Sequence, residues 1–437
     1  MKKVSFETLF EIPLRNGVTK PKKIRGKGYK MVNMGELFSY PIINNISMDR
    51  APLTELEEKN SLLENYDLLF ARQSLVRSGA GQCSIFISDD EKVCFESHII
   101  RCRLDKNKAN PLFYFYLFRN NIGRNIMDTI IEQGAGASGI RGSDLSKLMI
   151  PYIDIKIQND IAEKLFSLDQ KIELNTQTNQ TLEQIAQAIF KHWFIDFAPV
   201  HAKANALARG ETTEQAELAA MACLSGKTTE KITALKAQDP TAYHQLQQTA
   251  AAFPSEFVET EIGQVPKGWE VKKIDEVIQK IPVGKKYSQK TTVPDGKIPV
   301  LDQGKSGIIG YHNNIAGVKA SIQDPVIVFA NHTCYMRLIH FDFSAIQNVF
   351  AFKGQSINIY WLYLATLGKQ TFVEYKGHFP DFLIKQIVVP PKELTEIFGN
   401  LVQNSFSKIA LNLENNAILA KTRDLLLPKL LNGEVEL

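Results

Sequence analysis

Residues 20–30, KPKKIRGKGYK, combine six basic side chains with no acidic residue. Clustered lysine and arginine side chains neutralise nucleic-acid phosphates and release counterions, and glycine lets the backbone approach a ligand closely. The candidate DNA contacts of this segment are Lys20, Lys22, Lys23, Arg25, Lys27 and Tyr29. A solvated charged loop is the alternative interpretation.

A sparser version of this pattern occurs in the second half of the chain, at 284–290, GKKYSQK. The candidate contacts there are Lys285, Lys286, Tyr287 and Lys290. A single charged run is more often a solvated loop, but its recurrence in both halves puts phosphate binding on an equal footing with that interpretation. Both interpretations stay open.

Polar side chains follow two apolar runs, DLLFA at 67–71 and VIVFA at 326–330. Arginine pairs with guanine through two hydrogen bonds in the major groove, and asparagine or glutamine pairs with adenine. These runs and the basic loops predict further DNA contacts at Arg72, Gln73, Arg77, Arg141, Lys305, Asn331, His332 and Arg337. The alternative is that some of these side chains satisfy backbone groups of their loops.

Several patterns resemble catalytic motifs without completing them. Residues 134–139, GAGASG, fit GxGxxG, but a helical pattern precedes them and a strand pattern follows, which is the reverse of a dinucleotide site. Residues 110–113, NPLF, resemble the Asn-Pro-Pro-aromatic motif of adenine methyltransferases, with Leu112 at the second proline. His332 and Cys334 lack a second ligand pair for zinc. We therefore expect neither catalytic residues nor a metal site.

Composition describes an ordinary globular chain of 437 residues, long enough for two or three domains. The net charge is only +4, so positive charge for a polyanion must be local. The five cysteines form no CxxC pair, which is typical of a reducing compartment. The opening MKKVSFETLFEIPL does not resemble a secretion signal, and we expect a cytoplasmic protein without membrane spans.

Two similar stretches indicate the long elements that position these candidates. KIELNTQTNQTL at 171–182 is nearly repeated as KIALNLENNAIL at 408–419, an offset of 408 − 171 = 237. Apolar residues recur at alternating spacings of four and three, which is typical of a coiled-coil seam. The first seam comprises Ile161, Leu165, Leu168, Ile172, Asn175, Asn179, Leu182, Ala186, Ile189 and Trp193. The second comprises Phe398, Val402, Ser405, Ile409, Asn412, Asn416, Leu419, Arg423, Leu426 and Leu430.

Both seams place two asparagines at their centres: Asn175 and Asn179 in the first, Asn412 and Asn416 in the second. A buried asparagine penalises registers in which the amides cannot meet, so these residues set the coiled-coil register. Centre-to-centre asparagines predict an antiparallel pair. The alternative is two unrelated surface helices with asparagine as polar filler.

The order along the chain is module, helix, linker, module, helix. Short alternating apolar runs with a few helical segments make the modules α+β. The predicted divisions are a first module at 1–155, a helix at 156–197, a linker at 198–265, a second module at 266–391, and a helix with tail at 392–437. The linker, rich in Ala, Gln, Thr and Glu, is predicted to hold one or two surface helices.

Three stretches carry a more specific signal: SLDQKIELNTQTNQTLEQIAQAIFKHWFIDFAPV at 167–200, PKGWEVKKI at 266–274 and TRDLLLPKLLNGEVEL at 422–437. With the seam helices they cover about a quarter of the chain, and they resemble the specificity subunits of type I restriction-modification enzymes. The resemblance implies two target-recognition domains of mixed α/β structure, separated by an antiparallel coiled coil in a pseudo-twofold internal repeat. It also implies a split DNA target, with each domain reading one half and the helices fixing the gap.

The partners implied by the resemblance are double-stranded DNA, two modification (methyltransferase) subunits and restriction subunits acting as motor and nuclease. S-adenosylmethionine, ATP and Mg²⁺ are expected on those partners, and no cofactor on this chain. The alternatives are the specificity subunit of a type II methyltransferase–nuclease fusion system and a coiled-coil scaffold that does not bind DNA. The basic segment 20–30 disfavours the scaffold.

Overall fold

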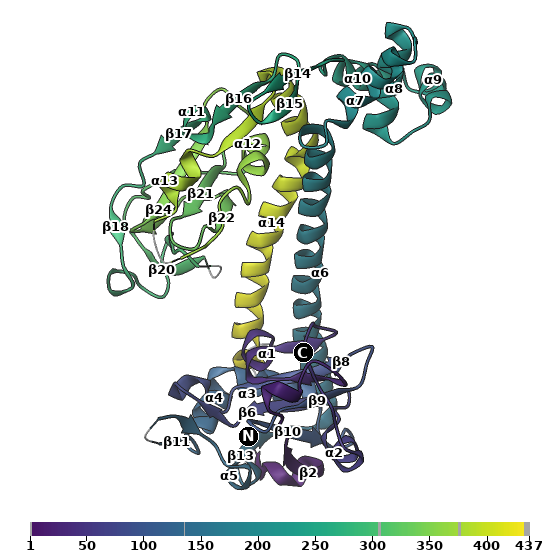
Figure 1. Ribbon diagram of the computed structural model, residues 1–437. Helices are drawn as coiled ribbons and strands as arrows, with labels where there is room; N and C mark the ends of the chain where they lie inside the picture. The colour runs from purple at the N-terminus through teal and green to yellow at the C-terminus, as the bar shows by residue number, and fades with distance from the viewer. Residues whose placement is uncertain (1, 135, 305–306, 375–376, 432–437) are drawn as a thin grey trace. The chain divides into compact units, whose positions relative to one another are not determined.

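The computed structural model describes residues 2–134, 136–304, 307–374 and 377–431, and the chain divides into two compact units. Unit 1 comprises Met1–Leu174 and Asn415–Leu437, and unit 2 comprises Asn175–Glu414. Each mixes strands and helices, so the α+β prediction is confirmed. The long helices α6 (Ile155–Phe194) and α14 (Lys392–Leu431) contribute residues to both units (Figure 1).

Unit 1 is built on a five-stranded sheet in the order β2-β10-β6-β8-β4, antiparallel except for the parallel β4–β8 pair. Its strands are β2 (Phe10–Asn16), β4 (Ile42–Asn44), β6 (Asp67–Ala71), β8 (Cys83–Ser88) and β10 (Ile99–Leu104). Strand β6 is buried throughout because both faces of the sheet are covered. Phe70 packs in one core and Leu69 in another on the opposite face.

A second sheet in unit 1 has the order β5-β3-β9, and two smaller sheets pair β1 with β13 and join β11, β12 and β7. The strands are β1 (Lys2–Ser5), β3 (Tyr29–Val32), β5 (Asp49–Ala51), β7 (Gln73–Ser74), β9 (Val93–Phe95), β11 (Glu132–Gln133), β12 (Ser138–Gly139) and β13 (Met149–Tyr152). The helices are η1 (Phe6–Leu9), η2 (Lys22–Ile24), α1 (Met34–Ser39), α2 (Glu55–Ser61), η3 (Arg77–Gly79), α3 (Pro111–Arg119), α4 (Asn121–Asp128) and α5 (Gly142–Ser146).

Helix α3, PLFYFYLFR, is a strongly apolar element of unit 1. The Asn110 side chain caps it by accepting a hydrogen bond from the Phe113 N–H, and Pro111 begins it, since the first helical turn needs no proline N–H. Phe113 to Phe118 are all buried, where they join the core that lies against the five-stranded sheet. That core also takes in Leu165 of α6 and Leu427 of α14.

Unit 2 has two four-stranded sheets, in the orders β17-β24-β21-β22 and β18-β23-β19-β20, and the pairs β14–β15 and β16–β25. The strands are β14 (Phe257–Thr260), β15 (Gly263–Pro266), β16 (Glu270–Lys273), β17 (Ile278–Ile281), β18 (Lys286–Tyr287), β19 (Ile298–Leu301), β20 (Ile308–His312), β21 (Val326–Ala330), β22 (Met336–Ile339), β23 (Ser344–Ile346), β24 (Val349–Gly354) and β25 (Gln386–Val389). The short helices are α11 (Ile274–Val277), η4 (Gln289–Thr291), α12 (Ile359–Thr366) and α13 (Phe379–Leu383).

The main sheets of the two units repeat one another. The order β2-β10-β6-β8 corresponds to β17-β24-β21-β22, with every neighbouring pair antiparallel. The registers correspond as well, because Ala71 pairs with Ile99 in unit 1 and Ala330 pairs with Val349 in unit 2. The internal repeat therefore includes the modules as well as the helices.

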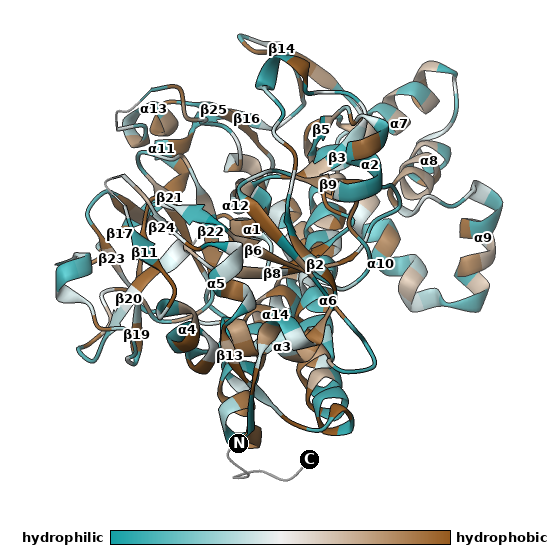
Figure 2. Cartoon of the chain, turned by 90° about the horizontal axis from the view of Figure 1, so that it is seen from below, coloured by the Kyte–Doolittle hydropathy of each residue, from teal (hydrophilic) through white to brown (hydrophobic). Residues whose placement is uncertain are grey.

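The linker holds more structure than its composition predicts. Residues 198–251 form four helices, rather than one or two, and they lie together as a small bundle (Figure 1). They are α7 (Ala198–Ala208), α8 (Thr213–Ser225), α9 (Thr229–Gln238) and α10 (Pro240–Ala251). Hydrophobic and hydrophilic segments alternate along α9 (Figure 2). Its residue Ile232 is fully buried. The bundle has a core of its own around Met221, which short alanine-rich helices supply without long apolar runs.

The seam helices run antiparallel within each unit. In unit 2, Phe190 of α6 stacks edge-on against Phe398 of α14 with 5.7 Å between ring centroids, while Asn179 bonds to Asn412. In unit 1, Ile172 contacts Asn416 and Asp169 pairs with Arg423. Partners therefore rise along α14 as positions fall along α6, and none of the twenty predicted seam residues is exposed.

Arginine at the seam position Arg423 has a specific partner. Its guanidinium pairs with Asp169 of α6, whose other carboxylate oxygen accepts a 2.6 Å hydrogen bond from the Tyr116 hydroxyl. Burial, followed by the Asp169 charge, raises the pKa of Tyr116 well above its usual range, so the hydroxyl stays a donor. This network fastens α3 to both seam helices inside unit 1.

The central asparagines make matching contacts. The Asn412 amide donates a 2.8 Å hydrogen bond to the Asn179 side-chain oxygen. Asn179 donates in turn to the Ile409 carbonyl at 3.5 Å, and Asn416 donates to the Ile172 carbonyl at 3.4 Å. The last two contacts are related by the offset of 237 in both partners, so the amides meet in one register.

Replacing Asn412 by alanine is expected to lower the free energy of unfolding by about 1–3 kcal/mol, because the Asn179 side-chain oxygen loses its hydrogen-bond donor within the seam. Replacing Asn179 and Asn412 together by leucine is expected to leave stability unchanged or raise it, because an apolar seam needs no polar partner. Urea denaturation of the full chain measures both. A cost below about 0.5 kcal/mol for the single change would place Asn412 among ordinary surface residues.

Candidate nucleic-acid interface

The basic segment of unit 1 divides into exposed and bound side chains. Lys22 and Lys23 lie in η2, and together with Lys27 they are exposed and make no ion pair with any residue that the structure describes. Gly26 and Gly28 adopt φ values of +98° and +93°, a conformation that glycine adopts without strain. These three lysines form the exposed basic loop, and their contact with DNA stays a prediction.

Three other predicted contacts in the segment serve the fold. Lys20 pairs with Glu57 of α2 at 2.7 Å, and this hydrogen bond is the main cause of the lowered pKa of Glu57. Arg25 donates to the Lys20 carbonyl and to the Asn33 side chain, both at 2.8 Å, because a fork of donors can close a loop on itself. A hydrogen bond to Glu58 raises the pKa of Tyr29. These side chains therefore stabilise the conformation of the loop through contacts within the protein.

The second basic stretch is only partly a counterpart of the first. Lys285, Lys286 and Lys290 are exposed, and Lys290 lies in η4, which occupies the place of η2 after the first strand of its sheet. Tyr287 differs from the prediction, because its ring is 7 % exposed and stacks on His312 at 4.2 Å. It packs in the module, and its ring is not presented to a base in this structure.

Four polar candidates gather around the small sheet of β11, β12 and β7 in unit 1. Gln73 is exposed in β7, and the backbone of Arg72 bonds to His98 and Ile140. Arg77 donates to the carbonyls of Asp128 and Ile131, while Arg141 pairs with Glu132 at 2.7 Å. The proximity of these four residues is compatible with one surface that contacts DNA. The hydrogen bonds and the ion pair of Arg77 and Arg141 support the alternative interpretation, in which these side chains stabilise their own loops.

The corresponding loop in unit 2 is shorter and more tightly bound. Asn331 is 8 % exposed, and its side-chain oxygen accepts a 2.8 Å hydrogen bond from the Phe379 N–H. The His332 N–H donates to Gln303, and its ring lies 3.1 Å from the Asn348 amide. Arg337 lies in strand β22 instead of the loop, and it donates to the Asp302 carbonyl at 3.0 Å.

Asn331 is therefore a structural residue in this arrangement. His332 fastens Gln303 to the loop, and Arg337 fastens Asp302 to strand β22. Desolvation by burial lowers the pKa of Arg337, whose Nε has no partner among the described atoms. Lys305 lies outside the described residues.

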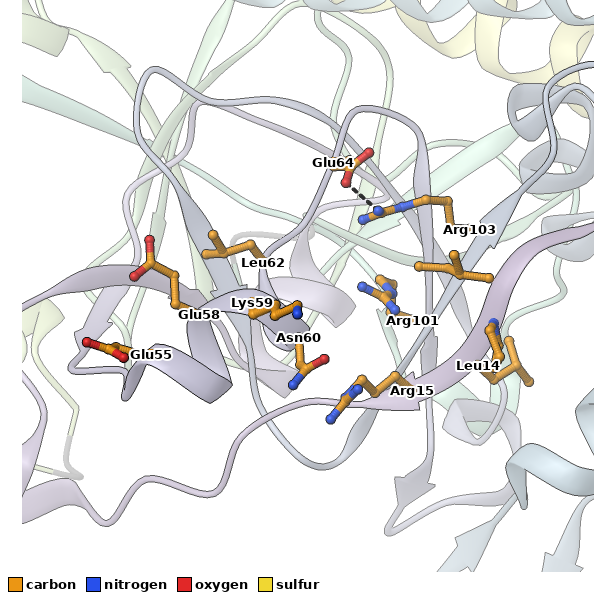
Figure 3. A pocket seen from close by; sticks show the side chains of 12 residues that line it. Leu14, Arg15, Glu55, Glu58, Lys59, Asn60, Leu62, Glu64, Arg101 and Arg103 are labelled. Carbon is orange, nitrogen blue, oxygen red and sulfur yellow. Dashed lines mark hydrogen bonds and ion pairs between the residues drawn. The ribbon is translucent and has the colours of Figure 1, made fainter.

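The sequence patterns missed a group of cations on the main sheet of unit 1. Arg15 of β2 lies opposite Arg101 of β10, and both line a pocket of about 810 Å³ together with Lys59 and Asn60 of α2 (Figure 3). The signal was present in IIRCRL at 99–104, since alternation along a strand puts Arg101 and Arg103 on the same face.

Neither metal binding nor membrane insertion finds support in the described part of the chain. Across residues 2–134, 136–304, 307–374 and 377–431, no three His, Cys, Asp or Glu side chains lie together in a way that could hold a metal ion. Within the same ranges, no helix is long and apolar enough to span a bilayer.

Comparison with known proteins decides the family. The chain is 34% identical over 402 residues to the type I restriction enzyme HindI specificity subunit of Haemophilus influenzae, covering 84% of this chain and 86% of that protein. The chain belongs to the type I restriction enzyme specificity subunits. Residues 1–184 also match the model of the type I restriction modification DNA specificity domain. Sequence-specific DNA recognition in a type I restriction-modification system is therefore its function.

More distant relatives agree with this assignment. The MjaIX specificity subunit of Methanocaldococcus jannaschii is 24% identical over 347 residues, covering 74% of this chain and 68% of that protein. The crystal structure of a type I restriction-modification S subunit from M. genitalium matches the fold with a TM-score of 0.52 at 14% identity. That match covers 98% of this chain and 95% of the other.

Proposed function

We propose that each unit of this specificity subunit reads one half of a two-part DNA target. The repeat of sheet order and register supports this proposal most directly, since two equivalent modules can present equivalent surfaces. The exposed lysines of η2 and η4 follow the same position in both modules and suit phosphate contacts. The loops around Gln73 and His332 are candidates for contact with base edges.

The helices α6 and α14 would then set the gap between the two half sequences. Each has 40 residues, or a length of about 60 Å at ~1.5 Å per residue. Two modules that read the same face of a duplex need centres about 34–36 Å apart, or one helical turn. A helix pair held in one register by asparagine contacts is a suitable spacer, because it has a single length.

The chemistry of the system is proposed to lie on partner subunits in the cytoplasm. Two methyltransferase subunits would bind S-adenosylmethionine and methylate adenine, and restriction subunits would use ATP and Mg²⁺ for translocation and cleavage. The chain itself would be non-catalytic and bind no cofactor. The incomplete catalytic motifs in its sequence support this division of labour.

The test is to produce the chain with its methyltransferase subunit and map methylated adenines across the host genome. The expected motif has two short specific halves separated by a fixed number of unspecified base pairs. A hybrid in which residues 270–389 come from a relative of different specificity is expected to change one half only. A single continuous motif, or a hybrid that alters both halves, would contradict the proposal.

A further inference from the structure

The pocket between helix α2 and the main sheet of unit 1 contains a buried arginine without a partner. Arg101 is 5 % exposed, its Nε has no hydrogen-bond partner, and its side chain lines the pocket (Figure 3). Among the described residues no carboxylate or carbonyl pairs with its guanidinium. Leaving a buried charge unpaired is costly, so such a group is retained where a ligand supplies the missing partner.

Neighbouring acids are already engaged with other cations. Asp67 is the acid whose charge acts most strongly on Arg101. It accepts two 2.8 Å hydrogen bonds from Arg103, and Glu64 also pairs with Arg103. Glu58 pairs with Lys92 at 2.9 Å. Desolvation lowers the pKa of Arg101, and these local pairs do not reverse that effect.

Two more cations of the pocket are unpaired. Arg15 lies directly across the strand pair from Arg101, and Lys59 reaches the pocket from α2, and neither forms an ion pair with a described residue. Of the three acids that line the pocket, Glu55 alone has no ion pair among the described residues. Three free cations against one free acid leave a net positive pocket, which also offers the polar side chain of Asn60.

The repeat shows that the fold does not require these cations. The register of the two main sheets places Ala351 of unit 2 where unit 1 has Arg101, and Ile281 where unit 1 has Arg15. Residues 313–325 of unit 2 hold no helix in place of α2. The cations are therefore an addition specific to unit 1.

We propose that this pocket binds a phosphate group, with Arg101 at its floor and Arg15 and Lys59 at its rim. A guanidinium presents parallel N–H donors that match two phosphate oxygens, and the two further cations strengthen the attraction of the pocket for an anion. The phosphate belongs either to a DNA strand or to a small phosphorylated ligand. Only the DNA source rests on the proposed function.

The test compares thermal unfolding of the full chain in sodium phosphate and in sodium chloride at equal pH and ionic strength. Phosphate is expected to raise the Tm of the unaltered chain by at least about 2 °C. Arg101→Met is expected to lose this response while keeping or raising the Tm in chloride, since it removes an unpaired buried charge. Arg50→Met is the matched control, because Arg50 pairs with Glu91 on the surface of the same unit.

Equal Tm values in phosphate and chloride, or an unchanged phosphate response in Arg101→Met, would overturn the proposal. If Arg101→Met does not fold, the exposed Lys59 gives the second variant, and Lys59→Met is expected to weaken phosphate binding at least about fivefold. An undiminished phosphate response of Lys59→Met would then overturn it in the same way.

A DNA-binding titration identifies the source of the phosphate. With a DNA phosphate in the pocket, Arg101→Met is expected to reduce the slope of log affinity against log salt by about one. An unchanged slope beside a lost phosphate response assigns the pocket to a small phosphorylated ligand. Since the phosphate measurement uses no DNA, failure of the pocket and failure of split-target recognition give different results.

Discussion

Insertion of seven residues after Thr176 in α6 and seven after Leu413 in α14 is expected to lengthen the gap of the recognised site by up to about three base pairs. A heptad continues the 3.5-residue period, so the seam remains intact on both sides. It adds about 10 Å at ~1.5 Å per residue, against ~3.4 Å per base pair. Both half sequences are expected to stay the same, as seen by mapping methylated adenines.

The insertion points keep the central seam contacts of each unit together. Asn179 still faces Asn412, and Ile172 still faces Asn416, because each pair lies on one side of the added heptads. The control carries fourteen added residues after Gly226, which lies between α8 and α9 of the linker bundle. An unchanged gap in the helix variant would refute the spacer role, and a changed gap in the linker variant would show that length elsewhere also matters.

Replacing Lys22, Lys23 and Lys27 together by glutamine is expected to weaken binding to all DNA sequences alike, by roughly 10- to 100-fold at moderate salt. Each lost phosphate contact also reduces the salt slope by about 0.9, giving a total reduction of two to three. Titrations of specific and unrelated duplexes at several salt concentrations measure both quantities. Arg25 is left in place because it holds the loop through Asn33.

The matched control replaces Lys227, Lys231 and Lys236, three exposed lysines of the linker bundle. It removes the same charge, so its expected effect on affinity is small if charge acts locally. Equal losses in both variants would mean that net charge alone is measured. An unchanged affinity in the first variant would assign the exposed basic loop to solvent.

The helix pair was predictable because periodicity is a property of the sequence itself. The seam residues from Ile161 to Trp193 are buried or half-buried as their spacing requires, and Asn179 meets Asn412. The linker bundle was underestimated because short alanine-rich helices have weak periodicity. Four helices there bury a small core that no single segment reveals.

The site was less predictable, because charge in a sequence does not say which carboxylate lies opposite it. Arg25 and Lys22 are three residues apart in one basic run, yet only Arg25 is bound within its loop. Tyr287 follows two lysines and is nevertheless packed on His312. Arg101 was overlooked because it lies in a largely apolar strand, and the sequence does not show which side chains of the neighbouring strands surround it.

The division of both long helices between the units has a consequence for how the protein is made. The core of unit 1 includes Leu427, which is 2 % exposed, beside Leu165 and the aromatic side chains of α3. During synthesis the ribosome must therefore add 427 − 165 = 262 residues after Leu165 before that core can close. Unit 1 emerges from the ribosome first, but its core is completed last. Until then, the apolar residues of that core stay exposed and need protection from aggregation.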